Sequence, residues 1–178
     1  MNILQIWIGK KPDKNIIDSM KSVLNNLSEN DKYYLISNTN FLNDNRVNLI
    51  NYNEYSNLIK LEYDFLNKIP KSKEYHWCRS DLIRLDYLSK NSDTLYLDCD
   101  VTILEPLYQL NNKIYLPKRK KLFDVFMLYG NKDFFKEVLN KAIQETKEIN
   151  YSWIYSIINH KRYINNYEIM PFNYKHGK

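Results

Sequence analysis

The sequence predicts an α/β fold with a mostly parallel central sheet flanked by helices. In the N-terminal half, short apolar segments rich in β-branched residues alternate with segments whose apolar residues recur at helical spacing. The composition, with 44% hydrophobic and 26% charged residues, is typical of a folded globular chain. No linker rich in Pro, Gly or Ser divides the 178 residues, so we expect a single domain over residues 1–178.

The first strand and the first helix have clear local signals. Residues 3–8 form a short, nearly continuous apolar run that is followed by Gly9 and Pro12, as a buried strand often is. Asp13 can then cap a helix, because its carboxylate can accept hydrogen bonds from the free N–H groups of the first turn. The apolar residues of this helix share one face: Ile16, Ile17, Met20, Val23, Leu24 and Leu27.

The remaining strands are short apolar runs bounded by polar or turn-forming residues. In chain order they are expected at residues 33–36, 47–50, 95–103, 113–116, 122–128 and 167–170. The remaining helices are expected at residues 55–66, 75–90, 134–143 and 153–158, where apolar residues recur at helical spacing. Pro70 follows the first of these helices and interrupts its pattern.

Composition excludes some functions. The glycines are Gly9, Gly130 and Gly177, too far apart for a dinucleotide-binding fingerprint or a phosphate-binding loop. If the protein binds a phosphate group, it must do so by a feature other than a glycine-rich loop. The net charge of +5 favours anionic partners without naming one.

Cysteine usage and hydropathy bear on the compartment. Cys78 and Cys99 cannot form a disulfide framework or a C-x-x-C site, and each is most simply a small buried residue in a reducing environment. No stretch has the length of a transmembrane helix, and no signal peptide follows Met1. We expect no transmembrane segment and a cytoplasmic location, in a bacterium or in host cytoplasm if the protein is viral.

Two aspartates follow the apolar part of the 95–103 strand. Because alternate residues of a strand share a face, Asp98 and Asp100 should project on the same side, about 7 Å apart, while Cys99 points the other way. Two such carboxylates repel each other unless a cation lies beside them. Mg²⁺ or Mn²⁺ suits oxygen ligands, and phosphate oxygens can complete the shell. The alternative is a solvated strand end or turn without a metal.

A second group of polar residues lies upstream, on the expected 75–90 helix. Asp81 and Arg84 are three residues apart and share a helix face. A carboxylate can accept from sugar hydroxyls, and a guanidinium can bind hydroxyls or phosphate. The alternative is an ordinary intrahelical ion pair.

Taken together, these segments resemble the sugar-binding region of DXD-motif glycosyltransferases. Ser80-Asp81-Leu82-Ile83-Arg84 and the later Leu95-Tyr96-Leu97-Asp98-Cys99-Asp100-Val101 are similar to the motifs of initiating mannosyltransferases, capsule and lipooligosaccharide transferases, and clostridial glucosylating toxins. Leu4-Gln5-Ile6-Trp7-Ile8-Gly9 resembles the opening strand of that group, and Ser37-Asn38 resembles a second strand end of the toxins.

The resemblance implies a GT-A fold, a UDP- or GDP-linked sugar donor, and Mn²⁺ or Mg²⁺. It also implies a glycan, a lipid-linked molecule or a protein as acceptor. Trp7 would stack on the nucleobase, and Asn38 would lie near the nucleotide. Ser80, Asp81, Arg84 and Tyr96 would belong to the donor site. Asp98 would touch ribose or sugar, and Asp100 would ligate the metal.

The same resemblance bears on the reaction and on the C-terminal residues. Related families retain the anomeric configuration, which predicts no dedicated base; if the enzyme inverts, Asp124 is the candidate base. Several enzymes with this fold complete the metal shell with a C-terminal histidine, which here is His176, and the alternative is a frayed tail. The chain departs from the family where Asp93-Thr94 replaces the usual Gly-Gly and where Leu4 replaces the histidine of the first strand.

Two other functions are compatible with the same residues. A metal-dependent nucleotidyl- or phosphotransferase could use the same pair of aspartates, although the chain lacks a phosphate-binding glycine loop. A non-catalytic anion-binding module could use the basic cluster Lys118, Arg119, Lys120 and Lys121. No nucleic-acid-binding motif accompanies that cluster, so we expect no nucleic-acid partner.

Overall fold

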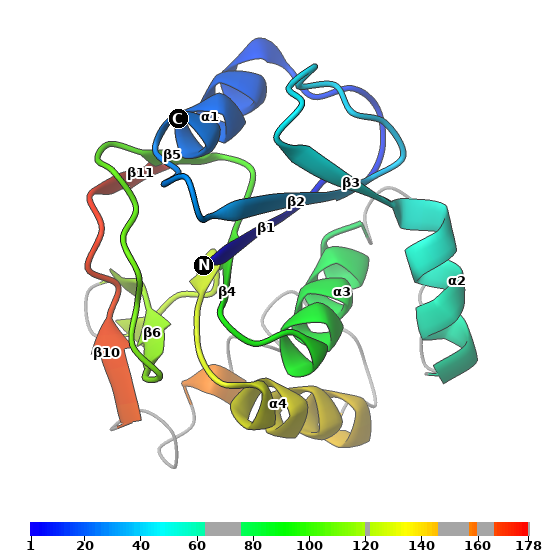
Figure 1. Ribbon diagram of the computed structural model, residues 1–178. Coiled ribbons are helices and arrows are strands. Elements are labelled where there is room, and N and C mark those ends of the chain that lie inside the picture. The colour runs from blue at the N-terminus through cyan, green and yellow to red at the C-terminus, as the bar shows by residue number, and fades with distance from the viewer. Residues whose placement is uncertain (63–75, 120–121, 146–156, 160–165, 178) are drawn as a thin grey trace.

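The computed structural model describes residues 1–62, 76–119, 122–145, 157–159 and 166–177 (Figure 1). Its main sheet has five strands, in the spatial order β3 (Val47–Asn51), β2 (Lys32–Ser37), β1 (Asn2–Ile6), β4 (Thr94–Leu97) and β9 (Met127–Leu128). The first four strands are mutually parallel, and β9 pairs with β4 in the antiparallel direction. The expected α/β class with a mostly parallel sheet is therefore confirmed.

Helices cover both faces of this sheet. The helices are α1 (Lys14–Asn25), α2 (Tyr52–Glu62), α3 (His76–Lys90) and α4 (Lys132–Glu145). Figure 1 shows α1 over one face, and α3 and α4 over the other. Within β1 the side chains alternate accordingly, so that Ile3 packs in the cluster that contains α1 residues while Leu4 packs with residues of α3 and α4.

The described residues also form small two-stranded sheets. The pairs are β5 (Val101–Ile103) with β11 (Tyr174–His176), β6 (Ile114–Leu116) with β10 (Tyr167–Ile169), and β7 (Lys118–Arg119) with β8 (Leu122–Phe123). The antiparallel pairing of β5 and β11 places the C-terminal residues beside the segment that follows β4. This pairing brings together parts of the chain that are far apart in sequence.

The first helix begins as the sequence predicts. The N-cap is Asp13, whose Oδ1 accepts a hydrogen bond of 3.0 Å from the backbone N–H of Ile16. The buried residues of α1 are Met20, Val23 and Leu24, three of the six predicted for its apolar face.

Two segments that we expected to form one strand each form two strands instead, so these two predictions are wrong. The segment 95–103 is divided into β4 and β5 by a turn over Asp98–Asp100, because the chain leaves the main sheet there and pairs next with β11. The segment 122–128 is divided into β8 and β9, because β8 pairs with β7 while β9 joins the main sheet. Of the expected 153–158 helix, residues 153–156 lie outside the described residues, as do residues 63–66 of the 55–66 helix.

Asp93 lies in the turn before β4, at one of the two positions where the family that the motifs resemble usually has Gly-Gly. Its φ of 53° is in the left-handed region, which aspartate tolerates better than most residues other than glycine. Its Oδ1 accepts hydrogen bonds from the Tyr129 hydroxyl (2.9 Å) and from Gln109 Nε2 (2.6 Å). The chain therefore forms a left-handed turn here without a glycine.

Among the described helices, none combines the length and the apolar character that crossing a bilayer requires.

Candidate active site

The two aspartates of the motif lie in a turn at the carboxyl end of β4. The backbone N–H of Val101 donates to the carbonyl oxygen of Asp98 over 3.1 Å, which closes the turn. The expectation that Asp98 and Asp100 project from one straight strand is therefore wrong. The turn nevertheless brings both carboxylates to the same place, at the edge of the sheet where ligands commonly bind in open α/β folds.

The residues below the turn hold its backbone. Gln5 is fully buried, and its Nε2 donates to the carbonyl oxygen of Asp98 over 3.1 Å. Its Oε1 accepts a hydrogen bond from the hydroxyl of Tyr33. Cys99 points inward, as predicted, and its Sγ donates to the carbonyl oxygen of Ile6 over 3.3 Å. Two contacts to β1 thus anchor a turn whose carboxylates face outward.

His176 reaches this turn from β11. The pairing of β11 with β5 sets His176 opposite Val101, and the N–H of Gly177 donates to the carbonyl oxygen of Asp100 over 3.3 Å. The C-terminal segment is therefore part of the folded site up to residue 177, and the alternative of a frayed tail is wrong for these residues. His176 Nε2 lies 3.4 Å from Asp100 Oδ1.

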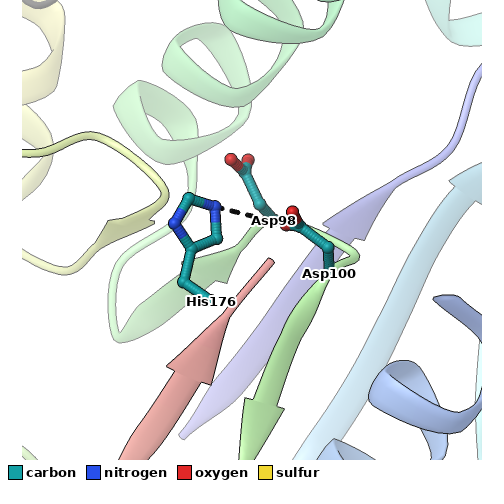
Figure 2. Close-up of side chains that lie close together, drawn as sticks. All are labelled: Asp98, Asp100 and His176. Atoms are coloured by element: carbon teal, nitrogen blue, oxygen red, sulfur yellow. Dashed lines mark ion pairs between the residues drawn. The ribbon is translucent and has the colours of Figure 1, made fainter. Parts of the chain in front are cut away.

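Asp98, Asp100 and His176 form one compact group, hereafter the carboxylate–imidazole triad (Figure 2). One potential ligand atom from each residue lies within 4.8 Å of the others. The hydrogen bond with His176 lowers the pKa of Asp100, and the same bond raises the pKa of His176. Two carboxylates and an imidazole are a donor set suited to Mn²⁺, which accepts oxygen and nitrogen ligands.

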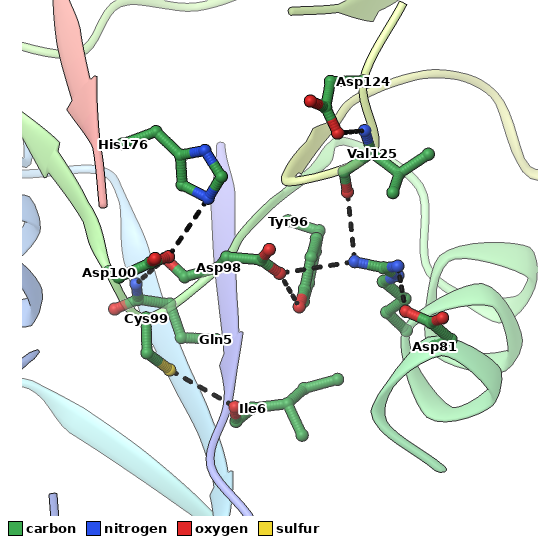
Figure 3. A network of polar contacts seen from close by, with 11 residues as sticks. Gln5, Ile6, Asp81, Tyr96, Asp98, Cys99, Asp100, Asp124, Val125 and His176 are labelled. Carbon is green, nitrogen blue, oxygen red and sulfur yellow. Dashed lines mark hydrogen bonds and ion pairs between the residues drawn. The ribbon is translucent and has the colours of Figure 1, made fainter. Parts of the chain in front are cut away.

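A buried arginine connects Asp98 to α3. Arg84 is 3% exposed, and its Nη1 lies 3.3 Å from Asp98 Oδ1 and 3.0 Å from the carbonyl oxygen of Val125. Its Nη2 pairs with the carboxylate of Asp81 one helical turn away. Its guanidinium carbon also lies 4.9 Å from the centre of the Tyr96 ring. The sequence-predicted pair is thus one part of a larger network, which Figure 3 shows from Asp81 to His176.

The environment of Asp98 changes its acidity. Burial raises the pKa of Asp98 to about 6, although Arg84 and a 2.5 Å hydrogen bond from the Tyr96 hydroxyl oppose the change. Burial likewise raises the pKa of Tyr96 well above its usual value, so the phenol remains a hydrogen-bond donor at neutral pH. A carboxyl group with this pKa exchanges its proton readily near neutrality and gives it up when a cation binds beside it.

Burial alone would lower the pKa of Arg84, but the neighbouring Asp81, Tyr96 and Asp98 outweigh it, and the net change is upward. The guanidinium therefore keeps its charge. Among the buried side-chain nitrogen and oxygen atoms of the described residues, Arg84 Nε is the one without a hydrogen-bond partner. The guanidinium therefore has partners at Nη1 and Nη2 and, within the part of the chain that the structure describes, none at Nε.

The other sequence-predicted site residues belong to segments that follow strands or lie on α3. Trp7 follows β1 and is half-buried, with its Nε1 donating to the carbonyl oxygen of Lys10 over 2.6 Å. Asn38 follows β2 and is exposed, and Ser80 is half-buried on α3. No hydrogen bond described in the structure joins these three side chains to the triad. Asp124 is half-buried, and its Oδ1 accepts from the N–H of Val125 over 2.8 Å.

A groove of about 630 Å³ opens on the α1 side of Asp100. Besides Asp100, its lining residues are Asn15, Ile16, Asp18, Ser19, Thr102 and Gly177. The groove therefore gives a ligand access to one carboxylate of the triad from the side of α1.

Sequence reasoning gave no individual role to Gln5, and it placed Phe126 only in a segment, residues 124–127, that resembles the acceptor side of related enzymes. A lone polar residue inside the apolar run of the first strand was a signal for Gln5, since a buried amide requires hydrogen-bond partners. Phe126 stacks on the imidazole of His176, with ring centres 3.8 Å apart and an interplanar angle of 15°. The sequence contains no comparable signal for this contact, because it depends on the pairing of β11.

Comparisons with known proteins bear on the fold. No protein-family description and no curated protein sequence matches the chain. The similar solved structures include the PaToxG glycosyltransferase, with a TM-score of 0.56 and 19% sequence identity over 89% of this chain. They also include the glycosyltransferase GlyE of Streptococcus pneumoniae, with a TM-score of 0.55 and 14% identity over 96% of this chain. The galactosyltransferase LgtC, in complex with donor and acceptor sugar analogues, has a TM-score of 0.54 and 12% identity over 95% of this chain.

The chain covers 66% of the PaToxG structure, 45% of the GlyE structure and 73% of the LgtC structure. At these identities the likeness establishes the architecture. The chain has the GT-A fold of these glycosyltransferases, as the motif resemblance predicted.

Proposed function

We propose that the protein is a metal-dependent glycosyltransferase that moves a hexose from a UDP- or GDP-linked donor to an acceptor hydroxyl. The observation that carries this proposal is the carboxylate–imidazole triad, whose ligand atoms lie within 4.8 Å of one another at the carboxyl end of β4. The same fold occurs in solved glycosyltransferases, which supports sugar transfer over other uses of such a group. The proposed acceptor is a glycan, a lipid-linked molecule or a protein.

In this proposal Asp100 and His176 ligate Mn²⁺ or Mg²⁺, and Asp98 contacts the donor or a metal-bound water. A divalent ion held there would neutralise the charge that develops on the leaving diphosphate. The chain lacks a glycine-rich phosphate loop, which makes a carboxylate-held cation the expected means of binding a diphosphate. The imidazole ligand favours Mn²⁺ over Mg²⁺, because Mg²⁺ prefers oxygen ligands.

The donor-binding residues are assigned from the motif resemblance and from the elements that carry them. Trp7 and Asn38 follow neighbouring parallel strands and would meet the nucleoside, while Ser80 and Asp81 on α3 would meet the sugar. Arg84 is buried and already paired, so its contribution to donor binding runs through the orientation of Asp81 and Asp98. Tyr96 acts in the same way, by donating to Asp98.

We propose retention of the anomeric configuration, as in the glycosyltransferases that the motifs resemble. In a retaining enzyme without a dedicated base, the site supplies orientation and charge stabilisation. Asp124 becomes the candidate base if the stereochemistry proves to be inversion. The configuration at the anomeric carbon of the product, read by NMR from an α-linked donor, decides between these outcomes.

Donor and metal binding test the proposal directly. Thermal unfolding should be measured with UDP- and GDP-sugars, each with and without Mn²⁺. A ligand that binds the folded state raises the apparent melting temperature. We expect the correct donor to raise it only when Mn²⁺ is present. No shift with any nucleotide sugar, in the presence of Mn²⁺ and at high ligand concentration, would overturn the proposal.

Substitutions in the triad test whether it is the site at which Mn²⁺ binds. Asp100→Asn and His176→Ala should each reduce Mn²⁺ affinity by at least about tenfold, because each removes a direct ligand. Glu168→Gln is the matched control, since this carboxylate is 47% exposed, pairs with Lys113 and lies outside the triad. Loss of Mn²⁺ binding in the control as well would show that the triad is not its site.

Product analysis separates the proposal from phosphoryl or nucleotidyl transfer. With a UDP- or GDP-sugar as the substrate, glycosyl transfer breaks the bond between the anomeric carbon and the diphosphate and releases a nucleoside diphosphate. Nucleotidyl transfer would break the bond between the two phosphates and release a sugar 1-phosphate, and transfer of the sugar phosphate would release a nucleoside monophosphate. We expect a nucleoside diphosphate and neither of the other two products.

A further inference from the structure

We propose that Phe126 is a positioning residue that fixes two members of the triad, His176 through its ring and Asp98 through its backbone. This inference rests on the proposed function, because it assigns Phe126 a purpose in metal binding. Phe126 lies in the segment between β8 and β9 and is 5% exposed. It is therefore a buried residue that contacts the site without offering a polar side chain to it.

The ring of Phe126 supports the imidazole. The two rings are stacked, with centres 3.8 Å apart and an interplanar angle of 15°. On the same ring, Tyr174 makes an edge contact with a centre distance of 5.5 Å and an angle of 63°. Phe126 thus contacts both residues of β11 that point toward it. The imidazole is held on one side by the phenyl face and at Nε2 by Asp100.

The backbone of Phe126 supports the aspartate turn. Its carbonyl oxygen accepts a 2.8 Å hydrogen bond from the N–H of Asp98, which extends the pairing of β4 with β9 by one step. The carbonyl oxygen of the preceding Val125 accepts from Arg84 Nη1, the cation that pairs with Asp98. Two consecutive residues therefore fix Asp98 at its backbone and, through Arg84, at its carboxylate.

This arrangement matters because His176 is otherwise weakly restrained. Its side chain is 29% exposed, and the hydrogen bond to Asp100 leaves rotation about that contact open. Metal ligands bind tightly when surrounding groups fix their orientation before the ion arrives. The phenyl face restricts the imidazole to one plane, and that plane keeps Nε2 within 3.4 Å of Asp100 Oδ1.

The first test needs no metal. A ring stacked on an imidazole shifts the imidazole proton resonances of His176 upfield in NMR spectra, and His176→Gln identifies those resonances. Spectra should be recorded at a pH high enough for the imidazole to be neutral. Phe126→Leu and Phe126→Met should remove the upfield shift, whereas Phe126→Tyr should retain it. An unchanged His176 spectrum in both unstacked variants would overturn the inference. If one of them fails to fold, the other decides.

The second test measures Mn²⁺ affinity by calorimetry in the same proteins. We expect about tenfold weaker binding in Phe126→Leu and Phe126→Met, and near-normal binding in Phe126→Tyr. Phe135→Leu is the matched control, because Phe135 is a fully buried phenylalanine of α4 that packs on Phe134 and lies outside the site. A general loss of stability would weaken binding in this control as well.

The outcomes separate the inference from the function on which it rests. If the unchanged protein binds Mn²⁺ and the unstacked variants bind it equally well, the positioning role is wrong and the proposed function stands. If the unchanged protein binds no Mn²⁺, the metal part of the proposed function is wrong, and the purpose assigned to Phe126 is wrong with it.

Discussion

Arg84 Nη1 lies 3.3 Å from Asp98 Oδ1, although Arg84 belongs to α3 and Asp98 to the turn that follows β4. The arginine side chain is 4% exposed, whereas the aspartate keeps 34% of its side-chain surface accessible. The guanidinium therefore forms the floor of the site, and the carboxylate forms part of its surface. Because Arg84 also pairs with Asp81 and donates to Val125, it connects a helix, a turn and the approach to β9.

Replacing Arg84 should lower the stability of the fold by more than the loss of an exposed charge would. Arg84→Met removes the partner of two carboxylates and leaves the carbonyl oxygen of Val125 without its donor. Breaking a buried ion pair on one side typically costs 3–5 kcal/mol, and the partial exposure of Asp98 places the expected loss near the lower end, about 3 kcal/mol. Urea unfolding of the metal-free protein measures this loss.

The control for this prediction is an ion pair at the surface. Lys14 and Asp18 on α1 have side chains that are 87% and 52% exposed. Lys14→Met should therefore leave stability almost unchanged. Equal losses in the two variants would contradict the central position assigned to Arg84.

The raised pKa of Asp98 predicts a pH dependence of stability. Burial raises this pKa from 3.8 to about 6 in the folded state. A group with a raised folded-state pKa contributes stability that is fully present below pH 3.8 and is lost as the pH rises through about 6. Asp98→Asn lacks this loss, so its melting temperature relative to wild type should rise between these pH values and then level off. The comparison should be made without metal.

Because the Asp98 side chain is about one third exposed, solvent screening makes this effect smaller than a fully buried group would give. The sign of the change is the prediction. A melting-temperature difference that stays constant from pH 3.8 to about 6 would show that folding does not raise the pKa of Asp98.

The left-handed turn at Asp93 predicts unequal effects of two small substitutions. Asp93→Ala places a residue that disfavours this conformation at a φ of 53° and removes the acceptor for Tyr129 and Gln109. We expect a loss of about 2 kcal/mol. Asp93→Asn keeps a side-chain oxygen and tolerates the left-handed region, so its loss should be below about 1 kcal/mol. Thermal unfolding of the two variants measures this difference, and equal losses would contradict it.

The sequence was sufficient to predict the parts of the fold that depend on local pattern. The apolar face of α1 and its Asp13 cap follow from spacing and side-chain chemistry, and both are present. The parallel sheet follows from the alternation of strands and helices. The 95–103 strand was predicted too long, because apolar character continues through Val101 and Ile103 even though the chain turns at Asp98–Asp100. Hydrophobicity shows which residues are buried but not which sheet buries them.

The site was predictable in its residue types more than in its geometry. Asp98 and Asp100 are named by the motif, His176 is suggested by the C-terminal histidine of other enzymes with this fold, and the structure brings the three together. Their proximity depends on the pairing of β11 with β5, which joins residues 71 or more positions apart and leaves no periodic pattern in the sequence. The stacking of Phe126 on His176 depends on the same long-range pairing. Such contacts become visible only once the strand order is known.

Cys99 provides a probe of the turn that carries the two aspartates. It is 7% exposed, its Sγ donates to the carbonyl oxygen of Ile6, and burial raises the pKa of its thiol. Both properties disfavour reaction with a thiol reagent, since the thiolate is the nucleophile. In a Cys78→Ser background, which leaves Cys99 as the one thiol in the sequence, labelling should be much slower in the native protein than in urea.

Labelling of Cys99 then requires the turn to open, and any ligand that binds the closed turn should slow it. With Mn²⁺ at about ten times its dissociation constant, the open population falls about tenfold and the labelling rate should fall by the same factor. His176→Ala removes a proposed ligand without touching the thiol, so it should abolish most of the slowing while leaving the metal-free rate within a few-fold of wild type. Native labelling at the rate of the unfolded chain would contradict the anchored turn. Slowing by Mn²⁺ that persists unchanged in His176→Ala would place the ion elsewhere.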